Sequence, residues 1–277
     1  MSRMTDFTVP STVPGRTLHA FCCEPEGEVR AVLQPSHGMV EFIDRYKPLA
    51  EYLAARGILV TGHDHLGHGG SIRTRADYGY FAQPDGNRAV LDDLHAVTAL
   101  TKQLYPGVPY FLLGHSMGGR AVSVYLKDSI KAAALWAPAD NTGLDGLEFL
   151  DHSAEGRQAI YDGAIQNGVL DLPKWGVTIS ADFVQQVADQ DPTASLRTYN
   201  GPLLLAYTAG DAELLSQTTI DLTRQAAAEH SGPLVDLTGQ YEDATHNFTA
   251  ASGKKIDDFS VRRRIESATA EFFEEYL

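Results

Sequence analysis

Short apolar runs alternate along the chain with longer segments in which apolar residues recur every three or four positions. This alternation predicts strand–helix–strand units and therefore an α/β fold with a mostly parallel sheet flanked by helices. The middle runs are almost entirely apolar, as expected for central strands that are covered on both faces. The predicted strands span residues 18–22, 31–34, 58–61, 110–113, 132–136, 203–207 and 234–237.

The segments between these runs carry helix signals of their own. Pro48 near the first turn and Gly57 just past the end bracket one predicted helix. A single apolar stripe within 90–104 predicts a second helix, and residues 119–127 can form a third. The last helix begins at Ser260 as its N-cap and places its apolar residues on one side, so we expect it to pack against the sheet.

One segment, 139–200, breaks the alternation because it is too long for an ordinary crossover between two strands. We interpret it as a cap inserted into a core that comprises residues 1–138 and 201–277. Within the cap, residues 157–165 and 181–188 are the best candidates for helices.

The sequence GHSMG, Gly114 to Gly118, directly follows the predicted strand 110–113 and precedes a segment that can be helical. In such a strand–turn–helix elbow the serine has a strained backbone, and the residues two before and two after it must be small. A GxSxG string arises by chance about 0.1 times in a chain of this composition, so its context carries the hypothesis. We predict Ser116 as a nucleophile; the alternative is a serine that only caps the next helix.

A serine hydroxyl reacts at neutral pH only with a histidine base and an acid that orients this base. In this architecture the acid and then the histidine follow the nucleophile, each on a loop after a later strand. Asp211 follows the strand 203–207 and is the predicted acid, with Glu213 as a second choice. His246 lies between the strand 234–237 and the last helix and is the predicted base.

Two backbone N–H groups are expected to form an oxyanion hole, one from Met117 after the nucleophile and one from Met39 in the loop after an early strand. Phe149 and Trp175 are aromatic residues of the cap that either line a substrate pocket or pack within the cap. The full set of predicted pocket residues is His37, Gly38, His115, Phe149, Trp175 and Phe183.

His63, His65 and His68 have the HxHxxH spacing of a dinuclear zinc hydrolase. Zinc hydrolases with this spacing carry an aspartate directly before the third histidine, where this chain has Gly67. Two glycines and Ser71 follow, which suits a tight turn better than a rigid metal site. We therefore predict a structural role for these histidines, and neither a metal nor a cofactor.

The charge and the cysteine content indicate which partners and which compartment to expect. The 22 basic and 36 acidic residues give a formal charge of −14, which repels phosphate backbones and anionic lipids and argues against nucleic acid. Cys22 and Cys23 are adjacent in a predicted strand and cannot easily pair. The first residues lack the apolar run of a signal peptide, and no uncharged apolar stretch reaches 18 residues, so we expect a cytoplasmic protein without an integral membrane segment. Both a monomer and a homo-oligomer remain open.

Three stretches, SHGMVEFIDRY, HDHLGHGGS and YFLLGHSMGG, together with the late aspartate and histidine, resemble one branch of the α/β-hydrolase superfamily. This branch, of the serine aminopeptidase S33 type, holds monoacylglycerol lipases and bacterial lysophospholipase-like proteins. The resemblance is closest over residues 30–139 and resumes from residue 201. It implies the α/β-hydrolase fold and the same roles for Ser116, Asp211, His246, Met39 and Met117.

The resemblance also treats HDHLGHGGS as a structural turn, and it matches Glu41 and Tyr46 to family positions without giving them a role. Thr208 stands where the family has a glycine, and the cap looks as much like that of cinnamoyl or feruloyl esterases. We expect a serine-dependent hydrolase of monoacylglycerols or lysophospholipid-like esters. The alternatives are a cinnamoyl, feruloyl or short-chain esterase, a zinc hydrolase, and a ligand-binding protein without turnover.

Overall fold

The computed structural model describes residues 2–79, 81, 86–173, 176–250 and 260–277. Trp175, predicted as a pocket residue, therefore lies outside the described residues. Among the described residues, no helix combines the length and the apolar character that are needed to cross a membrane.

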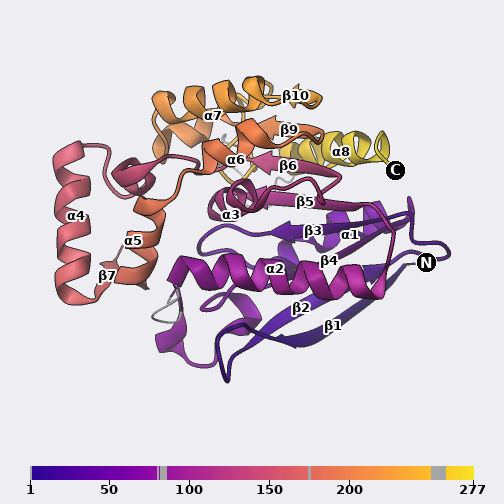
Figure 1. The fold of residues 1–277 in the computed structure, drawn as a ribbon, viewed down its shortest axis with the longest axis horizontal. Coiled ribbons are helices and arrows are strands. Elements are labelled where there is room, and N and C mark those ends of the chain that lie inside the picture. Colours follow the sequence, from indigo (N-terminus) through magenta and orange to yellow (C-terminus); the bar gives the residue numbers. More distant parts are fainter. Residues whose placement is uncertain (1, 80, 82–85, 174–175, 251–259) are drawn as a thin grey trace.

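An eight-stranded sheet forms the centre of the molecule (Figure 1). β1 pairs antiparallel with β2, and β2 with β4, whereas the strands from β4 onward run parallel to one another. Across the sheet the strands lie in the order β1 (Arg3–Pro10), β2 (Thr17–Glu24), β4 (Ile58–His63), β3 (Ala31–Ser36), β5 (Tyr110–His115), β6 (Ala132–Trp136), β9 (Leu203–Ala206) and β10 (Leu234–Asp236).

The central strands are buried along their whole length, which explains why their sequences are continuous apolar runs. Each strand predicted from these runs is confirmed, with ends that differ by no more than two residues. The edge strand β1 was missed because only Val9 of its eight residues is buried, so its sequence lacks the apolar signal of the others.

Helices cover both faces of the sheet (Figure 1). On one face lie α1 and α8, and Arg56, just beyond the end of α1, forms an ion pair with Glu274 of α8. On the other face α2, α3 and α7 lie with the helix α6 of the inserted segment. The bounds of these helices are α1 (Lys47–Ala54), α2 (Gly86–Leu104), α3 (Met117–Tyr125), α6 (Pro192–Thr198), α7 (Gln217–Glu229) and α8 (Ser260–Glu274).

The chain between β6 and β9 forms α4 (Ala154–Asn167), a hairpin of β7 (Val169–Leu172) and β8 (Val177–Ser180), α5 (Ala181–Asp189) and α6. The segments predicted as cap helices lie within α4 and α5. The hairpin was not predicted, because strands of four residues leave too short a pattern. The division into a core and a cap at 139–200 remains our proposal.

The helices of this insertion have defined ends. The Ser153 hydroxyl accepts a hydrogen bond from the Gly156 N–H at the start of α4, and Gly168 ends this helix with a φ of 75°. The Ser180 hydroxyl caps α5 in the same way, and Asp191 caps α6. Such caps typically stabilise a helix by about 1 kcal/mol each.

Candidate active site

The site lies at the edge of the sheet where the parallel strands end. Because β3, β5, β6, β9 and β10 run parallel, their carboxyl ends meet at this one edge. Ligands of open α/β sheets bind at this edge, beyond the carboxyl ends of the strands. The loops that follow β3, β5, β9 and β10 carry the residues that the sequence analysis singled out.

Ser116 occupies a sharp turn between β5 and α3, with φ 54° and ψ −120°. A side chain at Gly114 would place its Cβ 2.5 Å from the carbonyl oxygen of Gly118, and one at Gly118 would lie 2.2 Å from the carbonyl oxygen of Ser36. Glycine is therefore required on both sides of the serine. The strained backbone typically costs about 1–3 kcal/mol and is held by the surrounding packing.

His246 donates a hydrogen bond from Nδ1 to Asp211 Oδ1 at 2.5 Å. Asp211 is fully buried, and its other oxygen accepts from the backbone N–H of Thr208, also at 2.5 Å. The threonine in place of the family glycine is thus compatible with an acid loop that presents Asp211 to the histidine. Glu213, the second choice for the acid, is exposed.

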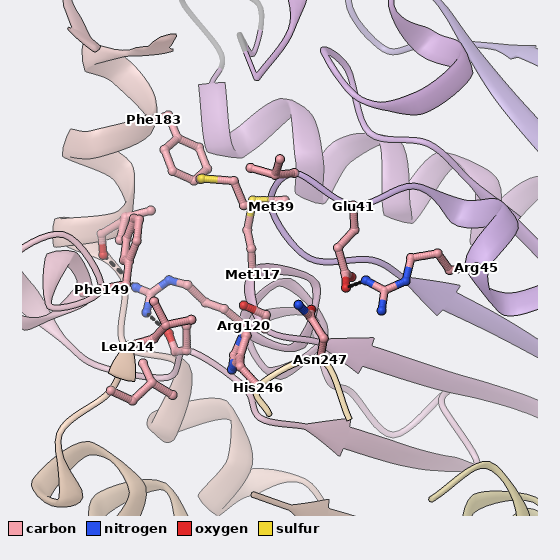
Figure 2. Close-up of a pocket in the computed structure, with 16 residues that line it drawn as sticks. Met39, Glu41, Arg45, Met117, Arg120, Phe149, Phe183, Leu214, His246 and Asn247 are labelled. Carbon is pink, nitrogen blue, oxygen red and sulfur yellow. Dashed lines mark hydrogen bonds and ion pairs between the residues drawn. The ribbon is translucent and has the colours of Figure 1, made fainter. Parts of the chain in front are cut away.

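Ser116 and His246 line the same cavity, which has a volume of about 320 Å³ (Figure 2). Among the hydrogen bonds of the described residues, none joins the serine hydroxyl to the histidine ring. Catalytic hydrogen bonds are often long without substrate and tighten when it binds. The proton transfer between these two residues therefore stays a prediction.

Met39 and Met117 both line the cavity. Met117 is the first residue of α3, where backbone N–H groups have no partner within the helix. The loop that holds Met39 packs tightly on the nucleophile, since a Cβ at Gly38 would lie 3.1 Å from the Cβ of Ser116. Their assignment as oxyanion donors remains a proposal that this placement supports.

Comparison with solved structures identifies the architecture. A thermostable carboxyl esterase from Bacillus coagulans superimposes with a TM-score of 0.73 at 16% sequence identity, covering 100% of this chain and 99% of that one. Est1E from Butyrivibrio proteoclasticus with ferulic acid reaches 0.71 at 18% identity over 98% of both chains. The chain has the α/β-hydrolase fold. A soluble variant of monoglyceride lipase from Saccharomyces cerevisiae shares this α/β-hydrolase fold, with a TM-score of 0.69 at 16% identity over 100% of this chain and 95% of its own.

Residues 27–157 match the model of the family described as serine aminopeptidase, S33. Human monoglyceride lipase is 37% identical over 121 residues, 40% of this chain and 35% of its own. The monoacylglycerol lipase of Mycolicibacterium smegmatis is 32% identical over 101 residues, 36% of this chain and 34% of its own. The matches thus span about a third of the length of these relatives.

The walls of the α/β-hydrolase cavity are mainly apolar. In Figure 2, Phe149 and Phe183 lie on one side of the view, Glu41 and Arg45 lie on the other, and His246 lies between them. The lining residues are Met39, Val40, Glu41, Arg45, Ser116, Met117, Arg120, Ala139, Gly146, Phe149, Phe183, Val187, Leu214, Leu215, His246 and Asn247.

Of the predicted pocket residues, Phe149 and Phe183 line this cavity, whereas His37, Gly38 and His115 do not. The prediction for these three is corrected. His115 is the last residue of β5, and the chain turns sharply after it. Its ring is buried between Glu41 and the backbone of His246, whereas Ser116 faces the cavity.

His37 lies in the loop after β3, and its ring stabilises this loop through two backbone hydrogen bonds. Its Nδ1 donates to the carbonyl oxygen of Gly38 at 2.8 Å, and its Nε2 accepts from the backbone N–H of His65 at 3.0 Å. Complete burial lowers the pKa of His37 to about 3, so the ring is neutral at physiological pH. This neutral ring fixes the backbone next to Met39.

The HxHxxH histidines are also buried. A metal site needs at least three ligand atoms of His, Cys, Asp or Glu side chains close together. Among the described residues, three such atoms lie within 4.8 Å of one another at the surface group Asp6, His19 and Asp44. His63, His65 and His68 form no such group, and burial lowers the pKa of His63 and His68 to about 4. Three ligand atoms of these histidines thus do not come within 4.8 Å of one another, as a shared metal ion would require.

Sequence reasoning missed the role of Glu41. Its Oε2 accepts from the Gly38 N–H at 2.7 Å and lies 2.9 Å from His115 Nδ1, while Oε1 pairs with Arg45. Burial alone would raise the pKa of Glu41, but His115, Arg45 and the Gly38 N–H hold it well below the usual range. The family match at Glu41 was the one signal that could have pointed to this contact.

Arg120 of α3 was also missed, although it lines the cavity. Its guanidinium donates to the carbonyl oxygens of Ala139 at 2.9 Å, Asn141 at 2.5 Å and Val187 at 2.6 Å. Burial lowers the pKa of Arg120 to about 10, which leaves it charged at physiological pH. One core side chain thus holds both the start of the insertion and the end of α5.

Proposed function

We propose that the protein hydrolyses carboxylic esters through an acyl-enzyme on Ser116. The observation that best supports this proposal is the Asp211–His246 hydrogen bond of 2.5 Å at the cavity into which the strained turn presents Ser116. A nucleophile, an oriented base and apolar walls are what acyl transfer from an ester requires.

In this proposal His246 Nε2 takes the proton of the Ser116 hydroxyl while the serine oxygen attacks the acyl carbon. Asp211 orients the ring and stabilises the imidazolium that forms. The N–H groups of Met39 and Met117 bind the tetrahedral oxyanion. His246 then gives its proton to the leaving alcohol, and a water molecule deprotonated by the same ring releases the carboxylic acid and the free serine.

The proposed substrates are monoacylglycerols or lysophospholipid-like esters with a single acyl chain. The apolar side chains of Val40, Val187 and Leu215 along the cavity suit such a chain. The names of the partial relatives, monoglyceride lipase and monoacylglycerol lipase, favour the same class.

An aromatic ester is the second candidate. Phe149 and Phe183 line the cavity and can stack on a ring, and a structural neighbour contains ferulic acid. Both candidates share one mechanism, so they differ only in which acyl and alcohol groups the cavity accepts.

An ester panel that varies the acyl and alcohol parts separately tests the proposal. We expect monoacylglycerol to give the highest kcat/KM and Ser116→Ala to lower hydrolysis at least about a thousandfold. The matched control is Ser129→Ala at an exposed loop position, which should keep full activity. A chelator should leave hydrolysis unchanged.

Four results would contradict this proposal or favour another function. Hydrolysis that survives Ser116→Ala would overturn the serine mechanism, and chelator-sensitive hydrolysis would favour a metal. A feruloyl or short-chain ester that is turned over tenfold better than monoacylglycerol would select the second candidate. Binding of esters without any turnover would favour a ligand-binding protein.

We also propose that the protein acts in the cytoplasm. Cys22 and Cys23 are both free, which is usual for proteins in reducing compartments. Cell fractionation with antibody detection tests this, and recovery from an oxidising compartment would contradict it.

A further inference from the structure

His115 lies buried between two loops that both belong to the candidate active site. Its Nδ1 is 2.9 Å from Glu41 Oε2, in the loop after β3. Its Nε2 is 2.9 Å from the backbone carbonyl oxygen of His246, in the loop after β10. The ring itself does not line the cavity, and its side chain is only 1% exposed.

Both contacts of the His115 ring are made to hydrogen-bond acceptors. The carbonyl oxygen of His246 can only accept. Glu41 also acts as an acceptor, since its carboxylate takes hydrogen bonds from the Gly38 N–H and from Arg45, as Figure 2 shows for Arg45. Donors from a backbone N–H and from a guanidinium, both independent of His115, favour the ionised form of Glu41.

A neutral imidazole carries a single N–H. In this arrangement it could satisfy one of the two acceptors, while its other nitrogen would direct a lone pair at an oxygen. An imidazolium donates from both nitrogens and satisfies both contacts. It also adds a second positive charge, beside that of Arg45, next to the buried Glu41 carboxylate.

We propose that His115 is a positioning residue that acts as an imidazolium and ties the backbone of His246 to the Glu41 loop. It touches neither substrate nor reacting atoms. It fixes the base relative to the nucleophile that follows it in the chain and to the loop that carries Met39. The positioning role rests on the proposed function, whereas the protonation state of His115 does not.

This tie is made to the backbone of His246 itself. The rest of its loop is held by the Asp211 hydrogen bond, by the Gly210 N–H, which donates to the carbonyl oxygen of Ala244 at 3.0 Å, and by the contacts between Thr245 and Thr249. Reaction rates respond steeply to such placement, and a displacement of about 1 Å can lower a rate about a hundredfold.

Several groups around His115 and Glu41 influence the charge of this pair. The ring of His246 lies 5.0 Å from that of His115 between centroids, and the ring of Phe248 lies at 6.2 Å. The charged and titratable groups that act on Glu41 or on the His246 ring are Arg45, Tyr46, His37, His68, Arg262 and Asp211.

The direct test is nitrogen-15 NMR of the histidine rings in the full chain, with His115→Gln to assign the signals. We expect both His115 nitrogens to carry protons at pH 7 and one of them to lose its proton in Glu41→Gln. His37 is an internal control, because its Nδ1 donates and its Nε2 accepts, so it should appear neutral in both proteins. A neutral His115 in the wild-type protein would overturn the proposal.

The kinetic test uses His115→Gln and Glu41→Gln, with His95→Gln at an exposed position of α2 as the control. Because a fluorophosphonate that labels Ser116 counts competent sites, kcat is expressed per labelled site. We expect kcat to fall about 10–100-fold in the first two variants with KM changed less than about twofold, and no change in the control. A purely structural role would lower the number of labelled sites and leave kcat per site unchanged, which would contradict positioning.

The two proposals fail in different ways. If Ser116→Ala kept full hydrolysis, the proposed serine mechanism would be wrong, while the NMR result would still decide the charge of His115. If His115→Gln did not fold, Glu41→Gln and the wild-type spectrum would still test the imidazolium. Wild-type kcat per site in a folded Glu41→Gln variant with a neutral His115 would refute the positioning role alone.

Discussion

Two groups of histidines lie at the same edge of the sheet and differ in their hydrogen-bond partners. The first group is fully buried without a hydrogen bond to a carboxylate, and burial lowers the pKa of each of its rings: His37, His63, His65 and His68. In the second group, His115 faces Glu41 at 2.9 Å and His246 faces Asp211 at 2.5 Å. The first group shapes the loops, whereas in the second group His246 carries the proposed proton transfer and His115 the proposed positioning role.

This difference shows that the partner within hydrogen-bond distance, and not the residue type or its spacing, decides what a histidine does. The HxHxxH spacing is typical of zinc sites, yet these rings pack on one another, with the His63 and His65 centroids 5.4 Å apart. A histidine with backbone partners and a dry environment stays neutral. One that faces a carboxylate can hold or pass a proton.

The largest expected effect comes from removing the charge of the acid. Asp211→Asn keeps the size of the side chain but cannot stabilise the imidazolium of His246, so hydrolysis should fall about 10⁴-fold. The control is Glu213→Gln at the neighbouring exposed position, which should keep full activity. Steady-state hydrolysis of the best ester checks this prediction, and an Asp211→Asn variant within tenfold of the wild type would contradict it.

Asp140 is a buried carboxylate that faces no histidine, and its effect should appear in the pH dependence of stability. Asp140 accepts from the Ser123 hydroxyl at 2.7 Å, and burial raises its pKa to about 7. Because the folded state binds this proton more tightly, its contribution to stability is complete below pH 4 and is lost as the pH rises through about 7. Relative to Asp140→Asn, the wild type should lose up to about 4 kcal/mol between pH 4 and pH 8.

Urea unfolding of both proteins at several pH values measures this difference. Parallel pH dependences of the two free energies of unfolding would show that Asp140 does not titrate in this range.

For the neutral histidines we expect the opposite pH dependence of stability. His63 is buried, and its lowered pKa of about 4 means that the unfolded chain takes up its proton first as the pH falls. This contribution to stability is present above about pH 6.5 and is lost as the pH falls through about 4, at up to about 3 kcal/mol. His63→Leu should remove it without changing kcat at pH 7.5.

Unfolding in urea at pH 7.5 and pH 4.5 checks the His63 prediction. If the variant and the wild type lost the same free energy between these pH values, or if kcat fell with the substitution, the division between the two histidine groups would break down.

The smallest effect concerns the substrate charge. At a formal charge of −14 the protein should take neutral esters several-fold faster than matched anionic esters at low salt, with the difference shrinking as salt is added. kcat/KM for a matched pair at two ionic strengths measures this. A faster anionic ester at low salt would contradict it.

The sequence predicted the core better than its edges for a physical reason. Strands buried on both faces, such as β5 and β6, are continuous apolar runs and can be recognised locally. β1 is exposed at the sheet edge, and the short β7–β8 hairpin depends on contacts within the insertion. Local patterns cannot report such contacts.

The same limit applies to the site. The elbow around Ser116 is a local motif, and the order of Asp211 and His246 follows from the fold, so these residues could be predicted. The contact of His115 with Glu41 spans 74 residues, and that with the His246 backbone spans 131. Only the folded chain brings these groups together.

The central claim is that Ser116 is a nucleophile activated by His246, and covalent labelling tests it most directly. After treatment with a fluorophosphonate, digestion and mass spectrometry should place a single adduct on the peptide that contains Ser116. We expect no adduct in Ser116→Ala and much slower labelling in Asp211→Asn. An adduct on another residue, or undiminished ester hydrolysis by a protein in which Ser116 remains unlabelled, would contradict the account.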